Sequence, residues 1–277
     1  MKKKVLLTGG TGFVGRQVIK YLSKQDIDLT LITRQAFDHR EFSDMSINSV
    51  IHSKDIFSED LGWWKESLKD IDVLIHLAWF VEPGEYLTSE KNIDCLIGSL
   101  RMTNAARAVG VKRVIMTGTC FEYDLTNGIA SIETPLNPLT PYAAAKAALF
   151  TFLNQWLPSQ EIGFAWCRLF YLYGDNEHPK RLVPYIRSQI EAGKTVDLTS
   201  GNQIRDFMDV EDAGKMIARI SLSDSNGPFN ICSGKGTTVR DMAEKIADEY
   251  DRKDLLNFNS RDENKFDPPT VIGVLNS

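Results

Sequence analysis

The chain has 277 residues, of which 43% are apolar and 25% are charged, and its formal net charge is −5. A chain of this length and apolar content can bury a substantial core, and the small acidic excess without a basic stripe excludes nucleic acid and anionic membrane surfaces as expected partners. No apolar stretch approaches the roughly 18 residues that a membrane span requires, and no export signal follows the short basic start, so we expect a cytoplasmic protein.

The cysteines and histidines show no metal-binding pattern. The four cysteines, Cys95, Cys120, Cys167 and Cys232, lack Cys-x-x-Cys spacing, and the four histidines do not cluster with them. We therefore expect reduced thiols and no metal site.

Along the first 173 residues, short apolar runs alternate with helical patterns. Strands are predicted at residues 5–8, 29–33, 50–53, 73–77, 114–117 and 163–170, and helices at 13–22, 63–69, 89–109 and 142–157. This alternation predicts an α/β fold with a Rossmann-like, doubly wound parallel sheet that has helices on both faces.

After Gly174 the alternation loosens. The pattern there predicts a helix at 182–192, a strand-and-turn region at 196–203, a strand at 206–210, a helix at 211–222, a strand at 228–232 and a helix at 239–250. We expect residues 1–173 to form a dinucleotide-binding domain to which residues 206–232 return. Residues 174–205 and 233–277 are then expected to form a smaller substrate-binding lobe.

A glycine-rich segment lies between the first predicted strand and the first predicted helix. It reads Thr8-Gly9-Gly10-Thr11-Gly12-Phe13-Val14-Gly15. The three spaced glycines, Gly9, Gly12 and Gly15, allow backbone N–H groups and a helix N-terminus to approach a pyrophosphate. The segment therefore predicts a dinucleotide site, to which Thr11, Phe13 and Val14 also belong.

Tyr142 and Lys146 form a second motif, four residues apart on one face of a predicted helix. A lysine held beside a tyrosine favours the phenolate, so that a phenol with an ordinary pKa of about 10 becomes an acid or base near neutrality. Proton transfer of this kind is required beside a hydride carrier.

Taken together, these motifs resemble those of the extended short-chain dehydrogenase/reductase family of nucleotide-sugar epimerases, dehydratases and reductases. Further matches follow in order: Asp55-Ile56, His76-Leu77-Ala78, Asn92, Arg168 to Gly174, Arg205 to Val210 and Phe229 to Gly234. The resemblance places Asp55, Ile56, Leu77 and Ala78 in the cofactor site, where Asp55 would accept a hydrogen bond from the adenine amino group.

The resemblance also supplies a third catalytic residue. Thr119 ends the fifth predicted strand, four residues before Tyr123, and would hydrogen-bond the substrate oxygen that Tyr142 protonates. Lys146 would also hold the nicotinamide ribose. The alternative is that Thr119 is an ordinary strand-end hydroxyl and that Tyr142 is a helix N-terminal aromatic.

The residues after Thr119 bear on the reaction. Dehydratases of the family have carboxylic acids here, whereas this chain has Cys120 and Phe121, which argues against dehydration. Cys120 is either an inert buried thiol or an acid/base partner at carbon, as in some epimerase-reductases of the family.

Cofactor choice depends on the residues that end the second strand. NAD-binding relatives usually have an acidic residue there, whereas this chain has Thr33 and Arg34. Because Arg34 suits a 2′-phosphate, the sequence favours NADP over NAD. Arg16 either adds a second positive charge or covers the helix surface.

Three arginines are candidates for substrate binding. By resemblance, Arg205 and Arg261 would hold a substrate pyrophosphate, and the segment from Arg181 would pass the nucleobase. Arg205 could instead pair with Asp206 or Asp209. Tyr171 replaces the asparagine that is frequent at this place in the family, which favours the reductases of deoxyhexose synthesis over the epimerases.

The sequence thus predicts an NADP-dependent reductase of a nucleotide-diphosphate sugar, a dTDP-, CDP- or GDP-4-keto-6-deoxyhexose. The alternative is an NAD-dependent nucleotide-sugar 4-epimerase with the same catalytic residues. A reductase-like protein that binds cofactor without catalysis would not need Thr119, Tyr142 and Lys146 together. Apolar residues on several faces of helices 89–109 and 142–157 predict a homodimer, although core packing would use the same residues.

Overall fold

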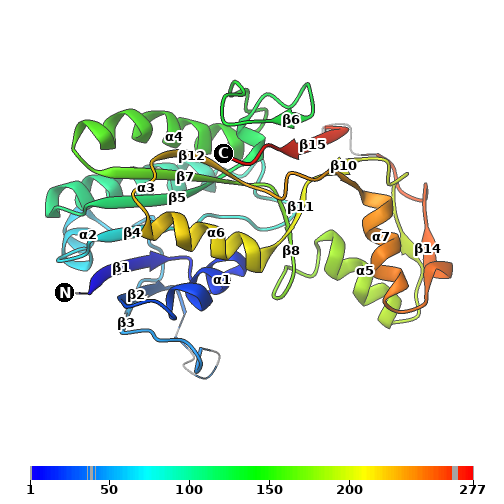
Figure 1. Cartoon of the computed structure of the whole chain (residues 1–277), viewed down its shortest axis with the longest axis horizontal. Helices are drawn as coiled ribbons and strands as arrows, with labels where there is room; N and C mark the ends of the chain where they lie inside the picture. The colour runs from blue at the N-terminus through cyan, green and yellow to red at the C-terminus, as the bar shows by residue number, and fades with distance from the viewer. Residues whose placement is uncertain (1, 36, 38–39, 41, 264–267, 277) are drawn as a thin grey trace.

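The computed structural model describes residues 2–35, 37, 40, 42–263 and 268–276. Its main element is a seven-stranded parallel sheet with the order β12-β7-β5-β4-β1-β2-β3 (Figure 1). The strands are β1 (Lys3–Thr8), β2 (Ile27–Thr33), β3 (Ser49–His52), β4 (Val73–His76), β5 (Arg113–Thr119), β7 (Gly163–Leu169) and β12 (Gly227–Ile231). The predicted α/β fold is confirmed.

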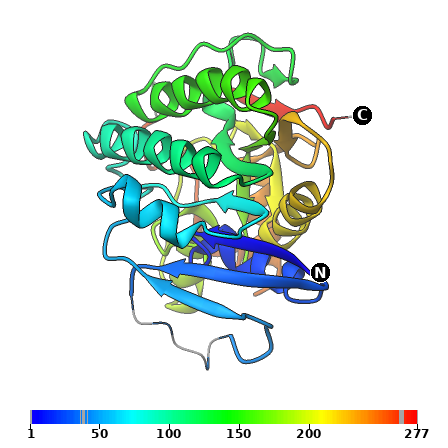
Figure 2. The same cartoon turned by 90° about the vertical axis from the view of Figure 1, so that its left-hand side faces the viewer.

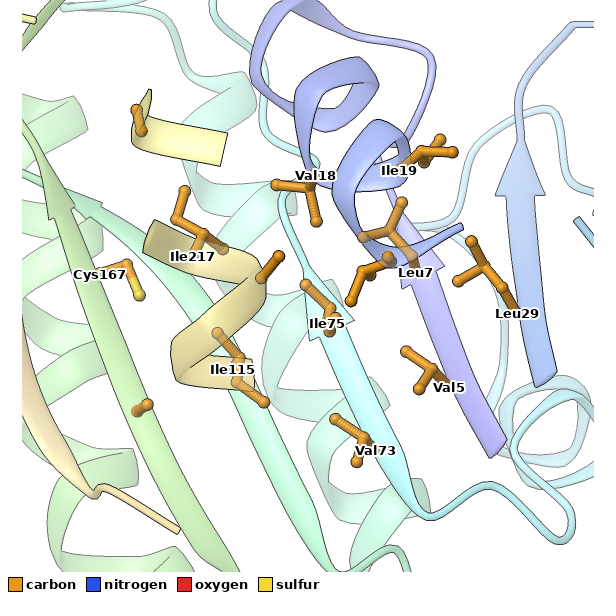
Figure 3. Packing of buried hydrophobic residues seen from close by; sticks show 14 of the residues in the cluster. Val5, Leu7, Val18, Ile19, Leu29, Val73, Ile75, Ile115, Cys167 and Ile217 are labelled. Carbon is orange, nitrogen blue, oxygen red and sulfur yellow. The ribbon is translucent and has the colours of Figure 1, made fainter. Parts of the chain in front are cut away.

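Helices cover both faces of this sheet. Consecutive strand residues point to opposite faces, and since the strands are apolar at most positions, both faces need a layer of helices. Val5 and Leu7 of β1 belong to a buried cluster that also contains residues of α1 (Phe13–Leu22) and α6 (Val210–Leu222). In Figure 3, Val18 of α1 lies near Leu7, and Ile217 of α6 lies near Ile115 and Cys167. Leu6 packs on the other side with α2 (Leu61–Ser67), α3 (Lys91–Val109) and α4 (Pro141–Ser159). Figure 2 shows α3 and α4 on one side of the sheet and α6 on the other. The resulting three layers bury the central strands β4 and β5 completely, whereas the edge strand β3 has no buried residue.

The strand order reverses between β1 and β4. From β1 the chain runs outward through β2 and β3, and from β4 it runs the other way through β5, β7 and β12. At the carboxyl ends of these two strands, the Thr8 hydroxyl lies 2.7 Å from Nδ1 of the buried His76. Such a reversal opens a crevice where open α/β sheets bind their ligands.

The second half of the chain adds a smaller group of elements. It contains α5 (Leu182–Glu191), α7 (Val239–Asp248), the strand pair β8 (Tyr171–Tyr173) and β11 (Phe207–Asp209), and the pair β9 (Val196–Asp197) and β14 (Leu256–Asn257). A four-stranded sheet has the order β13 (Thr237–Thr238), β10 (Ile204–Arg205), β15 (Thr270–Gly273) and β6 (Ile129–Ala130). In Figure 1, α5 and α7 lie at one end of the molecule, past β8 and β11. The 3-10 helices are η1 (Cys120–Glu122) and η2 (Lys253–Leu255).

The long predicted elements agree with the structure to within a few residues, and the helix predicted at 13–22 has those bounds. The strand-and-turn region predicted at 196–203 contains only the two-residue β9, and the sequence pattern did not predict β6, β8, β10, β13, β14 or β15. Strands of two to four residues are too short to show an alternation in sequence. The division into a cofactor domain and a substrate lobe stays a prediction, and residues 264–267 and 277 of that lobe lie outside the described residues.

Within the described ranges, no helix combines the length and apolar character needed to cross a membrane.

Candidate active site

The glycine-rich loop forms a tight turn between β1 and α1. The Gly12 amide donates to the Gly9 carbonyl over 3.1 Å, and Gly12 itself caps α1, so that a backbone without a side chain precedes the first helical turn. A Cβ at Gly15 would overlap the Gly9 carbonyl oxygen, and one at Gly9, which has a φ of +74°, would overlap the Ala78 amide. The loop therefore needs glycine at both positions, and its helix N-terminus can accept an anionic group. These features fit a dinucleotide pyrophosphate.

The structure brings two of the predicted cofactor residues, Leu77 and Ala78, against this loop. Leu77 donates its amide to the Thr8 carbonyl, and the next residue, Ala78, lies against Gly9. Asp55 is exposed after β3, where its carboxylate accepts from the Phe57 amide, and Ile56 packs against the core.

At the end of β2, Thr33 is buried and its hydroxyl donates to the Gln35 carbonyl, whereas Arg34 is exposed. Arg16, whose role the sequence left open, donates to the Thr11 carbonyl and lies over the Phe42 ring. The Arg34 side chain is therefore accessible to a ligand phosphate.

The predicted catalytic residues converge at the carboxyl end of β5. Thr119 is the last residue of β5 and caps η1, while Tyr142 and Lys146 come from the first two turns of α4. The Thr140 hydroxyl caps α4 by accepting from the Ala143 amide, which fixes the start of the helix at Pro141 and so places Tyr142 in its first turn. All three catalytic candidates are less than 10% exposed.

Contacts hold each of these side chains in place. The Lys146 ammonium donates to the Thr117 carbonyl over 2.7 Å and lies 3.8 Å from the centre of the Trp79 ring. The Tyr142 ring meets Tyr86 edge to face, with 4.8 Å between centroids, and the Thr119 side chain lies near enough to Tyr142 to lower its pKa. The arrangement is that of a proton donor with a second hydroxyl beside it.

The ionisation of this cluster differs from the sequence expectation that Lys146 lowers the pKa of Tyr142. Burial, followed by the nearby Tyr86, Glu122 and Cys120, raises the pKa of Tyr142, and the hydrogen bond with Thr119 lowers it less. Burial lowers the pKa of Lys146 to about 7, because its ammonium leaves water. Tyr142 is therefore a protonated phenol at neutral pH.

Lys146 also connects the catalytic cluster to the crevice between β1 and β4. Burial, together with the charge of Lys146, lowers the pKa of His76 to about 3, so His76 is neutral. His76 lies 2.7 Å from the Thr8 hydroxyl at the start of the glycine loop and 3.0 Å from Ser99 of α3. The candidate proton-transfer groups and the candidate dinucleotide loop therefore lie near one another, with His76 bonded to Thr8 at the start of the loop.

The three predicted substrate arginines occupy three different places. Arg181 is exposed at the start of α5, with its guanidinium 5.5 Å from the Tyr86 ring that also contacts Tyr142. Arg261 is exposed and donates to the Tyr185 hydroxyl. It lines a cavity of about 450 Å³ with Lys180 and Tyr185. Arg181 is thus linked through the Tyr86 ring to Tyr142.

Arg205 is buried in β10. Its guanidinium donates to the Ile204 and Pro269 carbonyls and lies 5.2 Å from the Tyr171 ring. The carboxylates that the sequence offered as its partners have other roles: Asp206 accepts from Ser233, and Asp209 caps α6.

Cys120 lies beside the site with 3% of its surface exposed, and burial raises the pKa of its thiol to about 12. A thiol this far from ionisation at neutral pH is a poor proton acceptor. The geometry therefore favours the inert thiol of the two roles that the sequence left open.

Two residues that sequence reasoning missed belong to this site. Trp79 covers Lys146, and its indole N–H donates to Asn92. Glu122, fully buried, accepts a hydrogen bond from the Thr119 amide. The Thr-x-x-Glu spacing from Thr119 to Glu122 is that of a capping box and was readable in the sequence.

Comparisons with known proteins find a matching family model and similar enzymes that are named for nucleotide sugars. The family model for the NAD dependent epimerase/dehydratase family matches residues 5–232. A dTDP-6-deoxy-L-talose 4-dehydrogenase (NAD(+)) of Aggregatibacter actinomycetemcomitans is 25% identical over 275 residues, which are 98% of this chain and 99% of the relative.

Two solved structures have the same fold over nearly the whole chain. A UDP-N-acetylglucosamine 4-epimerase from Methanobrevibacter ruminantium M1, in complex with UDP-N-acetylmuramic acid, has a TM-score of 0.84 at 26% identity, covering 99% of this chain and 90% of that one. A UDP-glucose 4-epimerase of Thermus thermophilus in complex with NAD has a TM-score of 0.81 at 20% identity, covering 98% and 90%.

Proposed function

This chain belongs to the NAD dependent epimerase/dehydratase family, and we propose that it reduces the 4-ketone of a nucleotide-activated 4-keto-6-deoxyhexose, with NADPH as the preferred reductant. The observation that carries the proposal is a protonated, buried phenol, Tyr142, next to the Thr119 hydroxyl and near the glycine loop. The talose 4-dehydrogenase is named for chemistry at the same carbon of a deoxyhexose, which supports this substrate class.

In this reaction the residues of the chain handle one proton and one oxygen. Tyr142 donates the phenolic proton to the ketone oxygen, and Thr119 orients that oxygen with its hydroxyl. When bound, the reduced nicotinamide supplies the hydride to the carbon. Lys146, with a pKa of about 7, is then able to return a proton toward Tyr142 at neutral pH.

For the cofactor, we propose that Arg34 binds the 2′-phosphate of NADP. Its exposure beyond β2, next to the hydroxyl side chain of Thr33 rather than an acid, supports this choice. The name of the talose dehydrogenase specifies NAD(+), and the Thermus epimerase binds NAD, so a direct comparison of the two cofactors is required.

The sequence assigned the substrate pyrophosphate to Arg205 and Arg261 and the nucleobase to the segment from Arg181. From the structure we propose a different arrangement, in which the cavity of about 450 Å³ near Arg261 receives the base and the exposed Arg181 acts on the sugar and diphosphate side, whereas Arg205 is buried in β10. Lys180 and Arg261 outnumber the one carboxylate of the lining, Asp197, so the cavity has a net positive charge, and the Tyr185 ring offers an aromatic surface. The proximity of Arg181 to Tyr86 supports a substrate that extends from this cavity toward Tyr142.

A 4-epimerase is the second candidate, because both solved structures described above are named 4-epimerases. It would use the same three residues, with Tyr142 first accepting and then returning the proton of the 4-hydroxyl. The raised pKa of Tyr142 supports the reductase, since that reaction starts from the protonated phenol.

We also propose a homodimer through α3 and α4. Ile93 and Ile97 are 60% and 49% exposed on α3, and Phe152 is 50% exposed on α4, although these side chains are apolar. An Ile97→Glu variant is expected to sediment as a monomer at concentrations where the wild type is a dimer. A wild-type mass of one chain at all concentrations would contradict this.

The test of the proposed reaction follows absorbance at about 340 nm, the reduced-nicotinamide band, with NADPH or NADH and dTDP-4-keto-6-deoxyglucose. Rapid oxidation, faster with NADPH and lost in Tyr142→Phe, is expected. Tyr21→Phe, which removes a hydroxyl on α1, is the matched control and should retain turnover. Interconversion of sugar epimers without net oxidation would instead identify the epimerase.

A further inference from the structure

Glu122 is a buried carboxylate directly behind the catalytic cluster that the proposed reaction does not use. It lies in η1, and both it and its partner Arg168 on β7 are almost completely buried. The Arg168 Nε donates to Glu122 Oε2 over 2.8 Å, and the Trp166 indole N–H lies 3.1 Å from both carboxylate oxygens. The Thr119 amide donates to Oε1 over 2.7 Å.

All of these neighbours are hydrogen-bond donors. The pKa of Glu122 is raised above its ordinary value, because burial outweighs Arg168 and the donated hydrogen bonds, which lower it. A protonated carboxyl would turn its own O–H toward a donor, so the arrangement requires the ionised form. A buried ion pair of this kind is weak evidence for stability by itself, because desolvation offsets the attraction.

The packing around the carboxylate leaves it little freedom. A Cβ at Gly118 would overlap both Glu122 Oε1 and the Trp166 indole nitrogen, so only glycine fits between β5 and this pair. The Arg168 guanidinium lies between the rings of Tyr123 and Phe150, at 4.5 and 4.3 Å from their centres. Its Nη1 also bonds the Tyr123 hydroxyl, which in turn donates to Asn230.

We propose that Glu122 is a positioning residue, which holds the Thr119 peptide and thereby aims the Thr119 hydroxyl at the substrate oxygen. The hydrogen bond from the Thr119 amide fixes the residue at the point where β5 turns into η1. The Phe121 amide donates to the Thr119 hydroxyl over 3.3 Å, so the same turn also restrains the side chain. Thr119 thus sits between a rigid carboxylate and Tyr142.

The charge of Glu122 supports this role, because it acts on the other two catalytic residues. It raises the pKa of Tyr142, which helps to keep the phenol protonated, and it raises the pKa of Lys146 against the effect of burial. Cys120 on η1 and Tyr86 also face Tyr142 and raise its pKa.

The test uses Glu122→Gln in the full-length protein, together with a control in the same network. The carboxylate accepts hydrogen bonds from three donors, those of Arg168, Trp166 and the Thr119 amide. The NH₂ group of a carboxamide would face one of these donors, so the turn that contains Thr119 shifts. Because a displacement of about 1 Å costs on the order of 100-fold in rate, we expect kcat to fall about 10- to 100-fold. The KM for the nucleotide sugar should stay within about twofold, since the substrate lobe is unchanged.

Two further variants separate positioning from folding. Glu122→Gln combined with Arg168→Met removes both buried charges, so it avoids an unpaired guanidinium, and should show the same loss of kcat. Tyr123→Phe removes the hydroxyl that links Arg168 to Asn230 without touching Thr119. It should lower stability and leave kcat within about twofold. An equal loss of kcat in Tyr123→Phe, or none in the two Glu122 variants, would overturn the proposal.

The inference rests on the proposed function, but a structural measurement separates the two. Crystal structures of wild type, Glu122→Gln and Tyr123→Phe would show whether Thr119 moves relative to Tyr142 in the first variant alone. If the wild type turns over no nucleotide sugar, the proposed function fails while this displacement still supports positioning by Glu122. An unmoved Thr119 in Glu122→Gln would refute the positioning role whatever the activity.

Discussion

Replacing the buried Lys146 by methionine should make the protein more stable while abolishing turnover. Lys146 is 3% exposed, and burial lowers its pKa from 10.5 to about 7. At about 1.36 kcal/mol for each pH unit, this difference corresponds to roughly 5 kcal/mol by which folding disfavours the charged form. Loss of the bond to the Thr117 carbonyl and of the contact with Trp79 offsets part of the gain. We expect Lys146→Met to raise the free energy of unfolding at pH 7 by about 2–4 kcal/mol.

The stability difference between Lys146→Met and wild type should depend on pH. Between pH 7 and pH 10.5 the unfolded chain keeps its Lys146 proton while the folded protein has lost it, so the stability of the wild type rises with pH relative to the variant. The advantage of Lys146→Met is therefore largest at and below pH 7 and disappears toward pH 10.5. Urea unfolding of both proteins at pH 7 and at about pH 9.5 measures the difference, which should shrink by about 3 kcal/mol.

A matched control accounts for the loss of any lysine side chain. Lys65 is exposed on α2, and Lys65→Met should change the free energy of unfolding by less than about 0.5 kcal/mol at either pH. A stability difference between Lys146→Met and wild type that does not change with pH would refute the argument from burial. So would a variant that is less stable than wild type at pH 7.

Three further substitutions test other parts of the site. Gly15→Ala places a Cβ against the Gly9 carbonyl and should weaken dinucleotide binding more than tenfold, as measured by fluorescence titration. Binding within twofold of wild type would show instead that the loop relaxes around the added methyl group. Cys120→Ser should keep kcat within about tenfold of wild type, because a thiol with a pKa of about 12 takes no part in proton transfer at neutral pH. A larger loss of kcat would favour an acid/base role of Cys120 at a substrate carbon. Arg34→Ala should weaken NADPH binding about tenfold or more and leave NADH binding unchanged, and equal effects on both cofactors would remove Arg34 from the phosphate site.

Sequence alone determined the features that depend on local spacing. The glycine loop, the α1 bounds and the placement of Tyr142 and Lys146 on one helix face follow from residues a few positions apart. The apolar runs of β1, β4 and β5 predicted a buried parallel sheet, because strands covered on both faces are apolar at nearly every position. The comparisons confirm the family that these motifs indicated.

Only the tertiary structure decided the ionisation and the surroundings of the site. The four-residue spacing of Tyr142 and Lys146 suggested a lowered tyrosine pKa, but burial acts more strongly and raises it. Burial depends on how α3, α4 and the β4–α3 loop pack together, which no spacing reports. Glu122 likewise meets Arg168 across 46 positions of sequence, and Trp79 reaches Lys146 from the loop that precedes α3. Such long-range contacts arise because parallel strands bring their carboxyl ends to one edge of the sheet, whatever the sequence distance between them.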